Sequence, residues 1–282
     1  MIRSRLVPFT DGLSRLPWWA LLTAMLGVLI AWHFATHEIY QKIVERLASG
    51  LIVTVRITLI AYSAALTLAL LIALARVSKN VLIYNIATFY VEIVRGLPTL
   101  VLLLYVAFVL IPGLIVGLNG LGSTLAPFSA LSGLADFLQQ LRTRDITNEL
   151  RVVVTLIIAY SAFLSEVFRG GIVAVEVGQM EAARALGMTY WQAMRHVVLP
   201  QAFRIALPAL GNDFIAMLKD SSLASVLGVE EITRLAQNYG SSSFLYLETY
   251  NVLAYLYLVM TLGLSMFVKL IERRTTRERP RR

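Results

Sequence analysis

The chain has 282 residues, of which 58% are hydrophobic and 15% charged, and its formal net charge is +8. A soluble domain is about 45–50% apolar and about 25% charged, so this composition excludes an ordinary soluble protein and indicates lipid as the solvent. Because there is no cysteine, the chain can form neither a disulfide framework nor a thiolate metal site.

Apolar residues gather into six stretches long enough to cross a bilayer, which takes about 20 mainly apolar residues. We therefore predict an all-α integral membrane protein. The first stretch also has features of a secretory signal peptide, but no small-residue cleavage site follows it, which favours an uncleaved anchor. The predicted spans are residues 16–35, 51–75, 97–118, 152–168, 205–229 and 252–270.

The third span contains Pro98 and Pro112, which kink or end helices, so its C-terminal edge is left open. Residues 112–148 are rich in Gly, Ser and Pro and then become polar, which predicts an outer loop with a short surface helix near 135–142. The segment GLIVG at 113–117 matches the small-xxx-small pattern of packed membrane helices, but beside Pro112 it is more typical of a loop.

The basic residues indicate an orientation. If the N-terminus is cytoplasmic, the cytoplasmic segments hold 17 Lys and Arg and the outer segments hold six. This bias follows the positive-inside rule, places both termini in the cytoplasm and argues against a nucleic-acid footprint. The cytoplasmic segments so counted are residues 1–16, 76–96, 169–204 and 269–282.

The cytoplasmic segment between the fourth and fifth spans has local helix signals. Glu181 to Leu186 are strong helix formers, and Gly187 can end that helix. Thr189 and Gln192 have the spacing of a capping box that would start a second short helix, which Pro200 then limits. Four apolar residues of this second helix form a contact set at the membrane surface: Tyr190, Trp191, Met194 and Val197. Such a set requires a protein partner or the headgroup layer.

This segment resembles the EAA motif of permease subunits in bacterial ATP-binding cassette (ABC) importers: Glu-Ala-Ala, three residues, Gly, nine residues, Ile, one residue, Leu-Pro. Only one position departs, where Val197 replaces Ile. The resemblance implies that the helix after the glycine is a coupling helix that docks on a cytoplasmic ATPase. The alternative is an ordinary loop with amphipathic helices. The matching residues are Glu181, Ala182, Ala183, Gly187, Leu199 and Pro200, and the ATPase-coupling residues expected include Tyr190 and Trp191.

The wider chain is similar to the polar amino-acid class of these permeases, through TVRITL at 54–59, VEIVRGLPTLVLL at 91–103, SEVFRGGI at 165–172 and LKDSSLASVLGVEEI at 218–232. The resemblance implies a type I ABC importer permease fold of about six transmembrane helices, a five-helix core plus an N-terminal extra helix. The domains expected are an N-terminal part at 1–47, a permease domain at 48–272 with the coupling loop at 176–204, and a basic tail at 273–282.

Several ionisable residues lie in or near the predicted spans, where an unpaired charge is expensive. Glu92 with Arg95, and Glu166 with Arg169, have helical spacing for ion pairs. Arg56 lies near the end of its span, which favours snorkelling to the interface. Two interpretations of Asp213, Lys219 and Asp220 stay open, a structural Lys–Asp network or a substrate path. The expected path residues are Glu166, Asp213, Lys219, Asp220, Arg56 and Arg95.

The sequence contains no GxxxxGK[ST] loop and no recognisable catalytic or metal-binding frame, so we expect no enzyme activity, metal or cofactor in this chain. The resemblance implies three kinds of partner in a bacterial inner membrane. They are a dimer of ATP-binding subunits, a second permease subunit, identical or homologous, and an extracytoplasmic substrate-binding protein. The competing hypothesis is a secondary transporter or channel driven by an ion gradient, which would favour internal inverted repeats.

Overall fold

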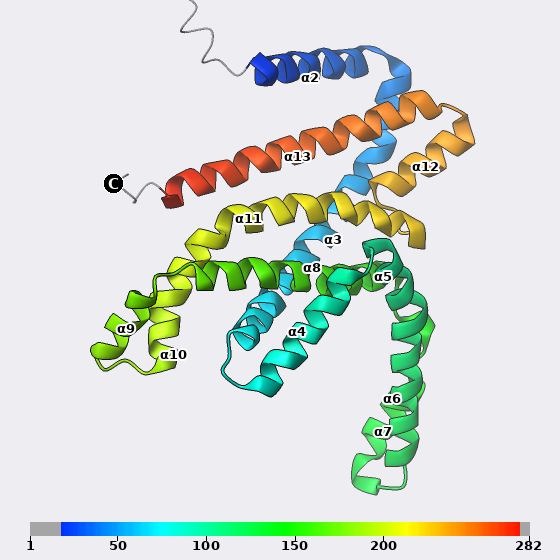
Figure 1. Cartoon of the computed structure of the whole chain (residues 1–282). Coiled ribbons are helices and arrows are strands. Elements are labelled where there is room, and N and C mark those ends of the chain that lie inside the picture. Colours follow the sequence, from blue (N-terminus) through cyan, green and yellow to red (C-terminus); the bar gives the residue numbers. More distant parts are fainter. Residues whose placement is uncertain (1–17, 277–282) are drawn as a thin grey trace, which may run out of the picture.

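The computed structural model describes residues 18–276, which form helices without a strand (Figure 1). Residues 1–17, and residues 277–282 of the predicted basic tail, lie outside the described part. The α-helices are α2 (Trp18–Thr36), α3 (Glu38–Arg76), α4 (Val81–Gly96), α5 (Thr99–Tyr105), α6 (Ile111–Leu125), α7 (Ser132–Gln140), α8 (Asn148–Val173), α9 (Val177–Ala185), α10 (Tyr190–Ala193), α11 (Leu199–Asp220), α12 (Ile232–Ser243) and α13 (Tyr246–Thr276). Two π-helical segments, η1 (Val106–Leu110) and η4 (Met194–Val198), and three 3-10 segments, η2 (Ser129–Leu131), η3 (Thr143–Asp145) and η5 (Ser221–Leu227), complete the order.

Each of the six predicted spans overlaps a helix. Within the described residues, four helices are long and apolar enough to cross a membrane, at Glu38–Arg76, Thr99–Leu125, Asn148–Val173 and Tyr246–Glu272. The first predicted span corresponds to α2, whose apolar part, Leu21–Thr36, is shorter. The fifth corresponds to the polar helix α11, which ends at Asp220 rather than continuing to residue 229. A 3-10 turn follows and stops at Gly228, whose φ of +75° favours glycine.

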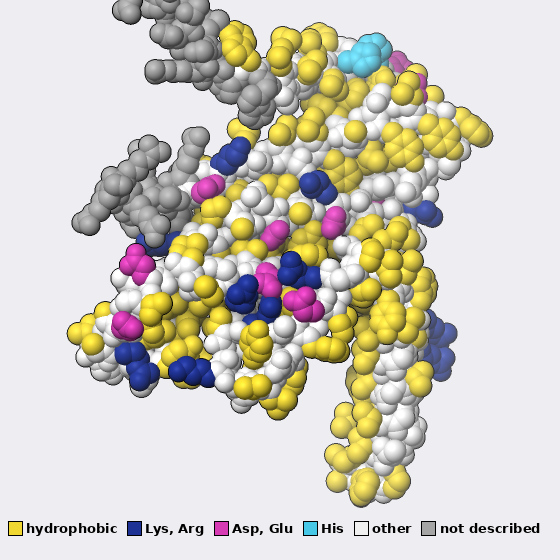
Figure 2. Space-filling view, viewed as in Figure 1, with side chains coloured by type: hydrophobic (Ala, Val, Ile, Leu, Met, Phe, Trp, Pro, Cys, Tyr) yellow, Lys and Arg dark blue, Asp and Glu magenta, His cyan; other side chains and the backbone are white. Residues whose placement is uncertain are grey.

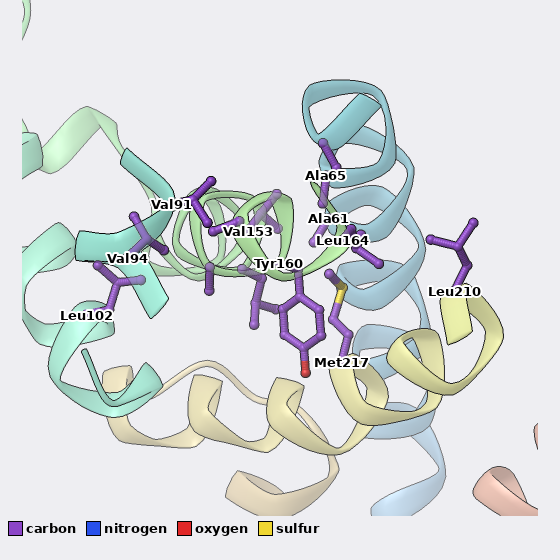
Figure 3. Packing of buried hydrophobic residues seen from close by; sticks show 14 of the residues in the cluster. Ala61, Ala65, Val91, Val94, Leu102, Val153, Tyr160, Leu164, Leu210 and Met217 are labelled. Carbon is purple, nitrogen blue, oxygen red and sulfur yellow. The ribbon is translucent and has the colours of Figure 1, made fainter. Parts of the chain in front are cut away.

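The centre of the bundle is the packing of α3 against α8 (Figure 1). A fully buried alanine recurs every fourth residue on α3, and this spacing places small side chains on one face, where another helix can approach closely. On the other side of α8, a Cβ added to Gly171 would lie 2.7 Å from the carbonyl oxygen of Ala202 in α11. Tyr160 of α8 and Met217 of α11 lie next to each other in this core (Figure 3). The alanines are Ala61, Ala65, Ala69 and Ala73.

The helix edge left open at Pro112 lies further along the chain, and the expectation that Pro200 limits its helix is wrong. A proline lacks the backbone N–H and clashes with the carbonyl four residues earlier, which here belongs to Phe108 and to His196. Each of these carbonyls lies in a π-helical segment, η1 or η4. A π-helical turn is wider than an α-helical turn and accommodates the ring. The helical path therefore continues from Thr99 to Leu125 and from Tyr190 to Asp220.

The predicted loop at 112–148 is partly wrong as well. Residues 112–125 are helical, and α6 and α7 form a hairpin that projects from the bundle (Figure 1). Gly113 and Gly117 lie inside α6, with no atom near the position of an added Cβ. Glycine favours loops in soluble proteins but is frequent in membrane helices, so the glycines of this segment do not indicate a loop. The predicted surface helix is confirmed as α7, three residues earlier than expected at its start.

Helix α4 was missed, because residues 76–96 were treated as a cytoplasmic connection. The side chain of Asn80 accepts hydrogen bonds from the backbone N–H groups of Leu82, at 2.9 Å, and Ile83, at 3.2 Å. This N-cap before an apolar run was the signal available in the sequence. Helix α4 packs against α3 and α8, and Leu97 and Pro98 separate it from α5.

At the N-terminal end of α12, a buried carboxylate fixes this helix to α3 and α13. Glu231 is fully buried and accepts hydrogen bonds from the N–H of Arg234, at 2.8 Å, and from the hydroxyl of Tyr257, at 3.2 Å. Burial raises the pKa of the Glu231 carboxyl. A Cβ on Gly50 of α3 would lie 2.6 Å from the backbone nitrogen of Ile232, so only glycine permits this close approach.

The projecting α6–α7 hairpin is attached to the bundle through one buried guanidinium. Arg151 of α8 donates from Nε to the carbonyl of Ile146 at 3.2 Å and from its terminal nitrogens to Ala107 at 3.0 Å and Thr143 at 2.7 Å. Only 8% of this residue is exposed. Three carbonyls from both sides of the hairpin thus converge on one side chain, which sets the angle of the hairpin.

We predict that Arg151→Leu lowers the free energy of unfolding by about 3 kcal/mol, because three carbonyls lose their donor. The measurement is thermal unfolding of the purified protein in mild detergent, with limited proteolysis of residues 126–147 as a second readout. Arg144→Leu, at an exposed position of the same segment, is the matched control and should change neither readout. Equal melting temperatures for both variants would exclude this anchoring role.

Candidate functional site

The segment that resembles the EAA motif forms two short helices joined by a turn. Helix α9 ends before Gly187, whose φ of +84° is a left-handed conformation that favours glycine. The predicted capping box is present: the Thr189 side chain accepts from the N–H of Gln192 at 3.3 Å, and the Gln192 side chain accepts from the N–H of Thr189 at 2.8 Å. The turn therefore fixes the direction in which α10 leaves α9.

The tip of this helix pair exposes apolar side chains. Trp191 is 68% exposed and Leu186 is 82% exposed, and the rings of Trp191 and Tyr190 form an edge contact. Met194, expected in the same contact set, is instead buried and belongs to the core of the bundle, as does Ala193. The exposed set is thus narrower than the sequence suggested, and it lies at the end of α10 farthest from α11 (Figure 1).

Glu166 of α8 is the centre of a charged cluster. Arg169, one turn later, donates from Nε to one Glu166 oxygen at 2.8 Å, which confirms the ion pair expected from the spacing. Arg76, at the end of α3, donates to the other oxygen. Arg95 of α4 lies 3.5 Å from Glu166 and over the ring of Phe163, so it does not form the predicted pair with Glu92. Sequence reasoning missed Arg76, whose partner lies ninety residues away in the chain.

Asp213 and Asp220 of α11 lie seven residues apart, about two turns, and therefore on the same side of the helix. The hydroxyl of Tyr160 in α8 donates to Asp220 at 2.9 Å. Lys219 is exposed, and among the described residues neither it nor these aspartates takes part in a salt bridge. The Lys–Asp network considered from the sequence is thus wrong, and the two carboxylates have no cationic partner in the described chain.

Arg56 lies apart from both charged groups. Its guanidinium forms an ion pair of 2.7 Å with Glu149 in the first turn of α8. Both side chains are partly exposed, which agrees with the interpretation that Arg56 reaches the membrane interface. Of the residues expected in a path, the structure therefore brings Arg95 together with Glu166, whereas Asp213 and Asp220 share one side of α11 about two turns apart.

A group of charged residues lies on the face of the molecule that Figure 2 shows. Figure 2 shows Lys and Arg together with Asp and Glu over α8, between α4 and α11, surrounded by hydrophobic side chains. Arg95 and Arg169 remain 41% and 39% exposed on the single chain. Since charges within membrane helices are costly to expose to lipid, this face is suited to water or to another protein subunit.

The chain was compared with known protein families and structures. The model of the family "Binding-protein-dependent transport system inner membrane component" matches residues 65–277. The chain is 32% identical over 228 residues to the glutamine transport system permease protein GlnP of Escherichia coli (strain K12), which covers 81% of this chain and 92% of GlnP. It is 33% identical over 257 residues to the L-cystine transport system permease protein TcyB of Bacillus subtilis (strain 168), covering 89% and 94%.

A solved structure is also similar. The crystal structure of an amino acid ABC transporter with histidines contains a chain that is 37% identical to this one, with a TM-score of 0.65. The match covers 83% of this chain and 95% of that chain. The arrangement of the helices, and not only the sequence pattern, is therefore shared with an ABC transporter.

We predict that Glu166→Gln destabilises the protein by about 3 kcal/mol, because Arg76, only 7% exposed, loses its buried counter-charge. Thermal unfolding in detergent measures the change. Glu38→Gln is the control, since it removes an exposed carboxylate 3.9 Å from Lys42 and should leave the melting temperature unchanged. A Glu166→Gln variant as stable as this control would mean that the cluster does not fasten α3, α4 and α8 together.

Proposed function

The chain belongs to the family of binding-protein-dependent transport system inner membrane components, and on this premise we propose that it carries polar amino acids through the membrane by alternating access. It is an ABC importer permease of the amino-acid type. The named substrates of its relatives, glutamine and L-cystine, support an amino acid as cargo. The energy comes from ATP hydrolysis by a separate subunit.

One observation carries the mechanism: the exposed helix pair and the acidic residues belong to one continuous helical path. Trp191 lies at the start of α10, and Asp213 and Asp220 lie on α11, which continues α10 through η4. A force applied at α10 therefore reaches α11 without crossing a flexible loop. The coupling residues of the proposal are Glu181, Ala182, Ala183, Gly187, Tyr190, Trp191, Leu199 and Pro200.

The proposed partners follow from two exposed surfaces, the apolar tip around Trp191 and the charged face over α8. The dimer of ATP-binding subunits docks on the exposed apolar tip around Trp191 of each permease subunit, because an exposed apolar surface in the cytoplasm requires a protein partner. A second permease subunit, identical or homologous, covers the charged face, because lipid cannot. A substrate-binding protein delivers the amino acid at the outer side, near α12, and both termini are cytoplasmic.

The path of the proposal lies along the charged face of the permease domain, residues 48–272. Asp213 and Asp220 face the ammonium group of the amino acid, while Glu166 and Arg95 line the inner half. Arg56 and Lys219 lie outside this path, the first because it pairs with Glu149. Helix α2, which precedes α3, is an addition to the core and lets the core begin at the outer side.

The experiment that tests this function is purification of the tagged protein from its own cells in mild detergent, with mass spectrometry of its companions. An ATPase of the cassette type should be recovered. The complex, reconstituted with its binding protein, should accumulate amino acids from a mixture only when ATP is present. Uptake driven by a proton or sodium gradient, without any ATPase, would instead support a secondary transporter.

We predict that Gly187→Pro leaves insertion into the membrane intact but reduces recovery of the ATPase at least tenfold. Proline fixes φ near −65°, whereas this turn requires +84°, so α10 would leave α9 in the wrong direction. Gly187→Asn is the matched control, because asparagine tolerates the left-handed conformation and should retain docking. Normal recovery of the ATPase with the proline variant would contradict the assignment of this helix pair.

A further inference from the structure

Three arginines from three helices converge on one glutamate in the inner half of the bundle. Arg76 comes from α3, Arg95 from α4 and Arg169 from α8, and each lies in salt-bridge range of Glu166. One carboxylate cannot neutralise three guanidinium groups, so two positive charges remain unmatched within the described chain. Arg76 and Arg95 lie at the C-terminal ends of α3 and α4, and a cluster of guanidinium groups of this kind can bind an anion.

The three arginines have different surroundings. Arg76 is nearly buried and, together with Arg169, occupies both oxygens of Glu166. Only Nε of Arg169 is used in that bond, and no hydrogen bond within the described chain engages its terminal nitrogens. Arg95 makes a longer contact with Glu166 and lies over the Phe163 ring, which holds its guanidinium in place. Arg95 and Arg169, which are both partly exposed, therefore keep free N–H donors at the charged face.

We propose that Arg95 and Arg169 bind the α-carboxylate of the transported amino acid in the inner half of the path, with Arg76 and Glu166 as their fixed support. This rests on the proposed function. Guanidinium groups bind carboxylates through paired, charge-assisted hydrogen bonds, and free donors on two neighbouring arginines match the two oxygens. Every α-amino acid carries this carboxylate, so the site recognises the class and not the side chain.

The arginine site is separate from Asp220. Tyr160, which donates to Asp220, precedes Glu166 by six residues of α8, or ~9 Å along the helix axis. The ammonium and carboxylate of one amino acid are attached to the same α-carbon and cannot span that distance. Asp220 and the arginines therefore contact the substrate in succession. Asp213 lies about two turns before Asp220 on α11, which runs antiparallel to α8, and so lies toward the level of the arginines.

The test uses the complete complex of permease, ATP-binding subunits and binding protein in proteoliposomes, supplied with a mixture of the twenty amino acids. Arg169→Gln should reduce the amino acid accumulated per ATP hydrolysed at least tenfold, since a charged hydrogen-bonding partner is lost. ATP hydrolysis and assembly should be retained. Lys42→Gln, which removes an exposed cation from the outer part of α3, is the matched control and should transport normally.

A second readout separates binding from a structural role. Equilibrium dialysis of the complex without binding protein should show that the wild type prefers the transported amino acid over its α-amide at least tenfold. This preference should disappear in Arg169→Gln and be partly restored in Arg169→Lys. If Arg169→Gln does not assemble, Arg95→Gln, whose residue is exposed and has no short hydrogen bond, takes its place in both measurements.

The outcomes distinguish this site from the proposed function. In one outcome, the wild type takes up amino acids, and the variants show the same uptake and the same discrimination against the α-amide. This result would overturn the arginine site and leave the proposed function in place. Absence of uptake of any amino acid by the wild-type complex would overturn both. Loss of uptake together with loss of the carboxylate preference is the expected result.

Discussion

The structure depends on the requirement that ionisable side chains in membrane helices have partners. Glu166 meets this requirement for arginines of α3 and α8 and draws α4 toward the same point. The apolar contacts alone would fix these helices less tightly, because membrane helices gain no hydrophobic free energy by exchanging lipid for each other. Small residues complete the arrangement: the alanine face of α3 allows a close approach to α8, and Gly171 of α8 allows a close approach to α11.

The helical path also links the two regions to which coupling and the substrate path are assigned in the proposal. Pro200 does not end this path, because the helix continues from α10 through the π-helical segment η4 into α11. The exposed tip at Trp191 and the carboxylates at Asp213 and Asp220 are consequently parts of one element. In the proposed mechanism this element transmits force from α10 to α11, and η4 is a place where it can change its local pitch.

The fold class, the approximate positions of the spans and the two short helices α9 and α10 could be predicted from the sequence because each depends on local patterns. Runs of apolar residues define spans, and the Thr189–Gln192 spacing defines a cap. The continuation of helices through Pro112 and Pro200 could not be predicted, since the compensating π-helical turns have no simple residue signature. The partners of Arg76 and Tyr160 could not be predicted either, because they lie on helices distant in sequence and only tertiary packing brings them together.

The charges of the proposed path bear on how one permease family serves different amino acids. Carboxylates on α11 and arginines around Glu166 complement the two groups that all α-amino acids share. Neither group reads the side chain of the substrate, and the relatives named for glutamine and for L-cystine differ in that side chain. In this proposal, discrimination among amino acids falls to the binding protein, while the permease needs only to hold a zwitterion weakly at two successive positions. Weak holding favours transport, because a substrate bound tightly at either position would not leave it.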